Sequence, residues 1–413
     1  MEQSVISDFN YLIMKCMFLS MHLNILNFND LINMKKGILL LLLCVLFSCS
    51  DEKNFSPQTC SLTATGQIKS FELDSDVKYN GFYLYKFKDK EGKDYLSFLN
   101  YRSNQILFYN WETGGLERKL VLQSEGPNGV GQVSGYYVKD FGNIYVSSYA
   151  YNGLLKVDTT AQIVQRIPYG TTSNGYKVLP SYTPSSHPNT APIFIDGKMY
   201  ITQPSVERFH PIAETPLTIE IDTVERKLEG TSITYSVLND KARKSNDLRF
   251  GRIFNDEKFI YSFFVSEDVY VSSQDSNDVK IIKVKSRYVD SPEEPQRIDE
   301  HGPRSNLEVP RYGNIIYDPY REVYYRFAYP RVELDNKINW WGKSVFGRKK
   351  FSVIILNKDL KVIGETLFPE GIYNSYVFVV AEDGLYISRD YQINFEQSED
   401  FMTFELFSLE KKS

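Results

Sequence analysis

Cysteine and histidine are scarce in this sequence, whose 413 residues include only four of each. Cys16 and Cys44 lie in or before an N-terminal leader, and Cys49, directly after it, is the expected lipidation site. Cys60 is therefore the one free thiol left, and an internal disulfide is excluded in the rest of the chain. The histidines that follow the leader are far apart, and no HExxH or other paired ligand spacing occurs. We therefore expect no metal site and no cofactor.

A basic surface is also missing, since 47 Lys and Arg face 52 Asp and Glu, a formal net charge of −5. That balance disfavours nucleic acid as a partner. A Gly-x-Ser-x-Gly motif and a catalytic Cys/His pair are absent as well. A pair of catalytic carboxylates is not recognisable here, because it depends on a separation in space. Catalytic residues thus stay unknown, and a non-enzymatic protein is favoured over an enzyme.

The one pronounced apolar run, residues 38–47, follows Lys35 and Lys36 and ends in the letters LFSC at Cys49. Its length is typical of a signal peptide and too short to span a bilayer. An apolar residue three positions before the Cys and a small residue directly before it resemble the bacterial lipobox. We therefore expect a lipoprotein signal peptide at 34–48, lipidation of Cys49 and attachment to the membrane through this anchor. The alternative is an N-terminal membrane helix with an unrelated Cys.

The residues on either side of this leader indicate how the chain is organised. Residues 1–33 show no coherent pattern and are interpreted as upstream sequence ahead of the true start at Met34, an extended n-region being the alternative. The acidic residues directly after Cys49 resemble the export signal that sends Bacteroidetes lipoproteins to the outer face of the outer membrane. We expect a cell-surface protein, with the periplasmic face as the alternative. Polar residues 49–62 predict a flexible tether, and 63–413 the folded domain.

The remainder of the chain has the composition and rhythm of strands, with 30 Tyr and 27 Phe in the whole sequence. Runs at 82–88, 94–100, 105–111 and 116–122 are separated by turn residues and predict a four-stranded antiparallel meander. A Tyr near the centre of a strand recurs at intervals of 50 to 63 residues, which indicates six repeated units. These residues are Tyr95, Tyr145, Tyr200, Tyr261, Tyr324 and Tyr386.

Six such units predict an all-β fold, a six-bladed β-propeller of four-stranded antiparallel blades. The last unit shows three strands, at 377–381, 385–389 and 402–408. Because the segment 67–73 alternates like a strand, we expect it to supply the missing fourth strand and to close the ring. Two β-sandwiches are the alternative, disfavoured because no linker divides the chain near its midpoint.

Three features together resemble one protein family. They are the lipobox leader, the letters EGPNGVG at 125–131, and the segment from Tyr317-Asp318 to Tyr324-Tyr325-Arg326-Phe327. This combination resembles the DUF4221 family, Bacteroidetes lipoproteins of unknown function related to TolB-like and NHL-like six-bladed propellers. The resemblance covers most of residues 60–410. It implies the fold and the address and no particular activity.

Two places are candidates for small-ligand contacts. Residues 125–131 link the first unit to the second, on the propeller face where channel ligands bind, so Glu125 and Asn128 are candidates; the alternative is a turn that needs its glycines. Arg249 precedes an inner strand in an Arg-aromatic-Gly motif, and Arg311-Tyr312 repeats it in the next unit. With Arg326, these residues could hold a carboxylate or sulfate. The alternative is structural arginines that bridge blades through backbone carbonyls.

The segment 331–350 interrupts the fifth unit and contains Trp340 and Trp341. They are candidates for stacking on a sugar or anchoring a partner, unless one packs inward and the other is partly exposed. Overall we predict a cell-surface binding or scaffold module for a peptide, glycan or partner lipoprotein. The alternative is an enzyme of hydrolase, lyase or lactonase type acting on glycans or lactones in the central channel. Converging carboxylates would favour the enzyme, and arginines with aromatics would favour binding.

Overall fold

The computed structural model describes residues 58–74, 77, 84–178, 191–203, 211–245, 247–274, 278–295, 304–341, 343–391 and 400–412, all within the unit Ser56–Ser413. The predicted signal peptide and Cys49 lie outside these residues. Within them, none of the helices has the length and apolar character needed to cross a membrane.

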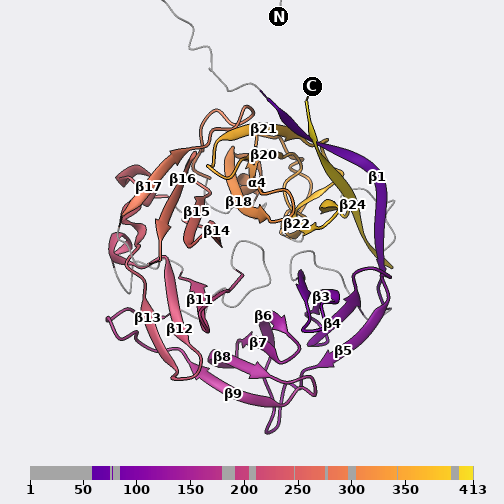
Figure 1. The fold of residues 1–413 in the computed structure, drawn as a ribbon, viewed down its shortest axis with the longest axis vertical. Coiled ribbons are helices and arrows are strands. Elements are labelled where there is room, and N and C mark those ends of the chain that lie inside the picture. The colour runs from indigo at the N-terminus through magenta and orange to yellow at the C-terminus, as the bar shows by residue number, and fades with distance from the viewer. Residues whose placement is uncertain are drawn as a thin grey trace, which may run out of the picture. The chain divides into compact units, whose positions relative to one another are not determined.

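Strands form nearly all of the regular structure in the described part of the chain, as four sheets of four strands and one sheet of eight (Figure 1). Each small sheet is an antiparallel meander of consecutive strands. The first set holds β2 (Leu84–Lys88), β3 (Asp94–Asn100), β4 (Gln105–Asn110) and β5 (Leu116–Val121). The second holds β6 (Val133–Asp140), β7 (Asn143–Ser148), β8 (Tyr151–Val157) and β9 (Ile163–Pro168). The third holds β10 (Ile193–Ile195), β11 (Lys198–Thr202), β12 (Thr218–Asp222) and β13 (Lys227–Gly230). The fourth holds β14 (Phe250–Asn255), β15 (Lys258–Phe263), β16 (Asp268–Ser273) and β17 (Val279–Lys283).

The eight-stranded sheet joins two further sets in the order β18-β19-β20-β21-β1-β24-β23-β22. The fifth set holds β18 (Arg311–Asp318), β19 (Val323–Tyr329), β20 (Ser352–Leu356) and β21 (Val362–Leu367). The sixth holds β22 (Asn374–Ala381), β23 (Gly384–Ser388), β24 (Phe401–Lys411) and β1 (Cys60–Glu72). The helical segments are short: η1 (Ile212–Glu214), η2 (Tyr235–Val237), α3 (Asp240–Arg243), α4 (Arg304–Glu308) and η3 (Ser344–Phe346).

The tyrosine repeat found in the sequence marks one strand position. All six of its members lie on the second strand of a set and all are buried: Tyr95, Tyr145, Tyr200, Tyr261, Tyr324 and Tyr386. The strands expected at 94–100, 105–111 and 116–122 agree with β3, β4 and β5 to within one residue. The periodic interpretation of the chain is therefore confirmed at the level of strands and sets.

β1 supplies the fourth strand of the sixth set, as predicted from the segment 67–73. It runs antiparallel to β24, with Ile68 opposite Glu405 and Phe71 opposite Met402. A shift in the register of this pair falls between Ala64 and Ile68. The backbone groups of β24 that would otherwise form a free edge are therefore paired along most of the strand.

A second pairing of β1 was not predicted from the sequence. Cys60 pairs in parallel with Gly364 of β21, and the Thr59 amide donates to the carbonyl of Ile363 at 2.8 Å. This contact joins the fifth and sixth sets into one sheet. It also corrects the expected tether, which was placed at 49–62. The strand already begins at Cys60, because that residue and Leu62 are buried and their backbones are paired.

Hydrophobic clusters lie between successive sets. One cluster joins the first set to the second, and others join each later set to the next, up to the sixth. A further cluster joins the sixth set to the first, where Phe71 of β1 packs on Trp111 and Phe404. Because the sets are covered on both faces, central strands such as β20 are buried at every residue, while fourth strands such as β5 expose most side chains.

Candidate functional site

The long connections between strands all lie at one end of the sets. In a meander, the links between first and second and between third and fourth strands share one end, and the remaining links share the opposite end. The links between first and second strands and between third and fourth strands, which are the first kind, have at most five residues. Long links of the second kind, some of them only partly described, are 122–132, 169–192, 203–217, 231–249, 284–310, 330–351 and 389–400. The end that carries them is termed the loop-bearing end.

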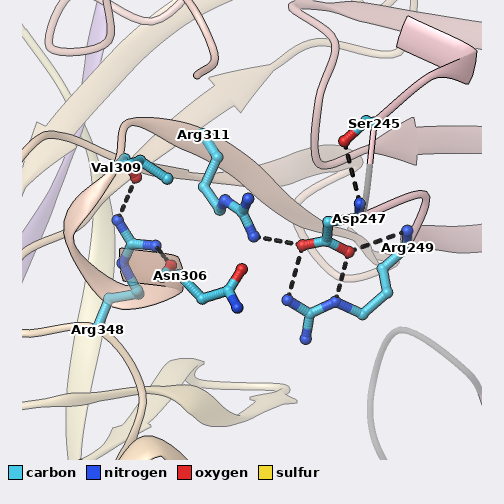
Figure 2. A network of polar contacts seen from close by, with 7 residues as sticks. All are labelled: Ser245, Asp247, Arg249, Asn306, Val309, Arg311 and Arg348. Carbon is cyan, nitrogen blue, oxygen red and sulfur yellow. Dashed lines mark hydrogen bonds and ion pairs between the residues drawn. The ribbon is translucent and has the colours of Figure 1, made fainter. Parts of the chain in front are cut away.

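Asp247, in the link 231–249, binds two arginines at this end (Figure 2). It accepts hydrogen bonds from Nε of Arg249 at 2.7 Å and from Nη2 at 2.8 Å, a bidentate pair. Arg311, the first residue of β18, donates through Nη1 to the Oδ2 atom of the same carboxylate. Burial raises the pKa of Asp247, but the charges and hydrogen bonds of the two arginines outweigh it and hold that pKa well below its ordinary value. The ion pair also brings the starts of β14 and β18 together.

Arg311 is buried, and two of its three guanidinium nitrogens have no partner in the described part of the chain. Its side chain is 3% exposed. Nη1 is bound to Asp247, whereas Nε and Nη2 make no hydrogen bond to a described residue. Figure 2 shows these two nitrogens turned away from Asp247. Since a buried donor without a partner costs about 1–3 kcal/mol, this edge is where a polar group from outside the chain is expected.

Arg348 is a third arginine of the same region and was not predicted. It comes from the insertion 331–350 and donates through Nη1 and Nη2 to the carbonyls of Asn306 and Val309, beside α4 (Figure 2). Burial lowers the pKa of Arg348, and together with smaller effects of the charges of Arg311 and Arg249 it brings that pKa to about 10. The three guanidinium groups are therefore close enough to repel one another, and two of them, those of Arg249 and Arg311, bind the carboxylate of Asp247.

The other two members of the Arg-aromatic-Gly motifs have packing roles. Tyr312 is fully buried in a core cluster, and its predicted ligand contact stays a prediction. A Cβ on Gly251 would lie 3.0 Å from Cα of Asn314, and one on Gly313 would lie 2.6 Å from the ring of Tyr329. Both glycines are needed because neighbouring groups approach the backbone closely.

Arg326 has the structural role that was the alternative to ligand binding. It is fully buried and stacks on Tyr312, with 4.1 Å between the guanidinium carbon and the ring centroid. Its five N–H donors are all engaged, by the Ser262 hydroxyl and by the carbonyls of Ser266, Glu267, Asp268 and Val284. The side chain bridges the fourth and fifth sets and has no donor left for a ligand.

Glu125 and Asn128 lie in a link held by its own turn, where the Gly129 amide donates to the Gly126 carbonyl at 2.9 Å. Asn128 binds the β8–β9 turn, since its Nδ2 donates to Gln162. Glu125 is exposed. Among the described contacts, neither residue meets the arginine cluster, and the turn interpretation accounts for both.

The two tryptophans have opposite exposures. Trp340 is 2% exposed, packs on Leu307 of α4 and donates through Nε1 to the Asp335 carbonyl at 3.0 Å. Trp341 is 54% exposed. This is the expected alternative in which one Trp packs inward. An open pocket of about 660 Å³ adjoins the insertion, lined by Arg304, Glu308 and residues 331–337.

The remaining residues with metal or thiol chemistry form no further cluster in the described chain. Among the described residues, no group of three or more His, Cys, Asp and Glu is placed to hold a metal ion. Cys60 is a buried free thiol. His187, His210 and His301 lie outside the described residues.

Comparison with known proteins finds one matching family and several similar structures. The profile of the family "Domain of unknown function (DUF4221)" matches residues 59–367. The crystal structure of a member of that family from Bacteroides vulgatus has a TM-score of 0.74 and 24% identity, covering 86% of this chain and 100% of that one. A protein from Bacteroides fragilis has a TM-score of 0.49 and 10% identity, covering 86% and 96% of the two chains. Virginiamycin B lyase from Staphylococcus aureus has a TM-score of 0.40 and 9% identity, covering 82% and 99%. No curated protein matches the sequence.

Proposed function

The chain belongs to the DUF4221 family, whose function is unknown, and from that premise we propose that it is a binding module of the cell surface that takes its ligand at the loop-bearing end. The observation that carries the proposal is a cluster of three neighbouring arginines with one carboxylate: Arg249 and Arg311 bind Asp247, and Arg348 lies near enough for their charges to lower its pKa. An excess of buried positive charge opposes folding. Binding of a ligand at this cluster would explain why the protein contains such an unfavourable excess of charge.

The proposal includes a closed ring of six blades as the support of this site. Three features favour it: six sets of four strands, a hydrophobic cluster between each set and the next, and a cluster between the sixth set and the first. β1 would complete the sixth blade, so that both ends of the domain take part in closure.

The proposal also places the module on the outer face of the outer membrane, anchored by lipid on Cys49. The lipobox, the charged residues before the apolar run and the acidic residues behind the Cys support this address. The ligand would then be a peptide, a glycan or a partner lipoprotein that is accessible at the surface.

Binding is favoured over catalysis because of how Asp247 is held. Both of its carboxylate oxygens are paired with arginines, and its pKa is lowered. A general acid near neutral pH needs a raised pKa, and a general base needs a free oxygen. The arginine-lined site with the aromatic rings of Tyr329 and Phe264 nearby has the character expected of a binding site.

A pull-down from intact cells tests the proposal. Tagged full-length protein is cross-linked on the cell surface and compared with two variants, Arg249→Glu at the loop-bearing end and Lys358→Glu in the short β20–β21 link at the opposite end. Wild type and K358E should recover the same ligand, and R249E should lose it. Equal recovery by all three proteins would overturn the proposed binding end.

A further inference from the structure

We infer that the ligand group bound at this site is a carboxylate, and that it pairs with the Nε–Nη2 edge of Arg311. The inference rests on the proposed function, because it specifies the chemistry of what is bound there. A comparison of Arg249 with Arg311 inside one network carries it (Figure 2).

Arg249 shows which group fits this edge of a guanidinium. Nε and Nη2 carry parallel N–H bonds whose spacing matches the two oxygens of a carboxylate. In Arg249 these atoms bind Asp247 at 2.7 and 2.8 Å. In Arg311 the same two atoms have no partner among the described residues, although the side chain is only 3% exposed. Arg311 therefore presents a complete carboxylate-binding edge that no described residue fills.

The charge of the site favours an anion. Arg249, Arg311 and Arg348 contribute three positive charges, and Asp247 contributes one negative charge. A carboxylate at the free edge of Arg311 would reduce the repulsion between the arginines. It would also supply acceptors to two buried donors that are otherwise unmatched in the described chain.

Two further unpaired donors belong to the cluster member Arg348 and to Asn374 beside it. Nε of Arg348 and Nδ2 of Asn374 are buried and have no hydrogen-bond partner in the described chain. The two residues adjoin, since the Arg348 amide donates to the Ser375 hydroxyl at 2.9 Å. Arg249, with a side chain 56% exposed, is the member that solvent reaches. The cluster thus has an exposed cation and buried donors, which suits capture of an anionic group.

The burial of Arg311 favours a carboxylate over a tetrahedral oxyanion. Sulfate and phosphate can also bind one guanidinium edge with two oxygens, but their other oxygens need further donors or solvent. At an edge that is 3% exposed, the planar group with two oxygens leaves fewer acceptors unpaired.

Acetate and methanesulfonate test the inference, because they are small monoanions that differ in planarity. Their binding to the purified protein is measured by calorimetry and by thermal melts at constant ionic strength, with chloride as the reference. The proteins are wild type, Arg311→Lys and, as a control in the short β12–β13 link, Arg226→Lys. Acetate should bind wild type and R226K with the same affinity. Its affinity for R311K should be lower by a factor of about ten or more, because lysine keeps the charge but lacks the two parallel N–H donors of arginine. Methanesulfonate should bind wild type more weakly than acetate.

Each other outcome overturns the inference. Equal affinity of the two anions would show that the site does not prefer a carboxylate. Unchanged acetate binding in R311K would show that the anion does not bind at Arg311. No binding of either anion would show that there is no anion site. Should R311K fail to fold, wild-type crystals soaked in acetate decide, since acetate must then lie against Nε and Nη2 of Arg311. The pull-down with R249E does not depend on the anion, so a failure of the proposed function is seen separately.

Discussion

Gly364 of β21 lies against Cys60 of β1 so closely that a Cβ on Gly364 would be 2.1 Å from the carbonyl oxygen of Cys60. The two residues form the parallel pair between these strands. Because β1 also pairs antiparallel with β24, it lies between β21 of the fifth set and β24 of the sixth. A glycine is required where two backbones approach in this way.

Substitution of Gly364 tests this contact. We expect Gly364→Ala to lower the free energy of unfolding by about 1–3 kcal/mol, because the added methyl group forces the strands apart. Denaturant unfolding measures the change. Gly170→Ala is the control, since a Cβ there meets nothing within 4 Å. Equal stability of G364A and wild type would mean that β1 and β21 do not approach as described.

Removal of β1 should be far more damaging than removal of the residues before it. A chain that begins at residue 75 loses the partner of β24 and the packing of Phe71 on Trp111 and Phe404. We expect aggregation or a steep fall in melting temperature, with a loss of several kcal/mol out of roughly 5–15 kcal/mol. A chain that begins at Gln58 should melt like one that begins at Cys49. Equal melts for starts at residues 58 and 75 would contradict ring closure by β1.

The strands could be predicted from the sequence because their signals are local. Alternating apolar residues and turn residues located β3 and β4 to within a residue. The pairing of β1 with β21 could not be predicted, because it depends on how the ends of the chain meet. Its one register pair, Cys60 with Gly364, leaves no pattern in either strand.

The site was predictable only in part. The repeated Arg-aromatic-Gly motif indicated Arg249 and Arg311, and Asp247, two residues before Arg249, was a local signal that could have been used. Arg348 lies in a run of basic residues typical of an exposed surface, and its burial depends on carbonyl groups near α4. Arg326 likewise binds backbone carbonyls, which any sequence supplies.

Asp390 should make stability depend on pH. Burial raises the pKa of Asp390 to about 6, although hydrogen bonds from Thr403 and Ser388 oppose the shift. The folded protein thus keeps a proton that the unfolded chain releases near 3.8. This contribution to stability is full below the unfolded pKa and is lost as pH rises through about 6.

Comparison with Asp390→Asn isolates the effect, because Asn does not titrate. From about pH 4 to about pH 7, the unfolding free energy of wild type should fall relative to D390N by up to about 3 kcal/mol. Denaturant unfolding of both proteins at each pH measures this difference. A difference that stays constant with pH would contradict the raised pKa.

The lipid anchor should be visible by mass spectrometry. Protein extracted from membranes should begin with an acylated Cys49, and Cys49→Ser should leave the membrane fraction, because two or more acyl chains are needed for stable anchoring. An unmodified peptide spanning residues 47–51 as the main species would rule the anchor out.

Protease added to intact cells should digest the protein. Protection until the outer membrane is permeabilised would place it on the periplasmic face.

Arg326 should be essential for stability and dispensable for anion binding. Arg326→Met keeps much of the apolar stem but removes the hydrogen bonds to the carbonyls of residues 266, 267, 268 and 284, of which that of Glu267 still accepts from the Val284 amide. Since each unpaired group costs about 1–3 kcal/mol, the free energy of unfolding should fall by at least about 3 kcal/mol. Arg226→Met, in an exposed turn, should change it by less than about 0.5 kcal/mol.

Anion binding by the same variant separates the two arginine roles. At a temperature where R326M is still folded, acetate should bind it as it binds wild type, because all five donors of Arg326 serve the joint between the fourth and fifth sets and none points to the site. Calorimetry on the folded variant measures this. Loss of acetate binding in folded R326M would show that Arg326 takes part in recognition, and the division between a bridging Arg326 and a ligand-binding Arg311 would then be wrong.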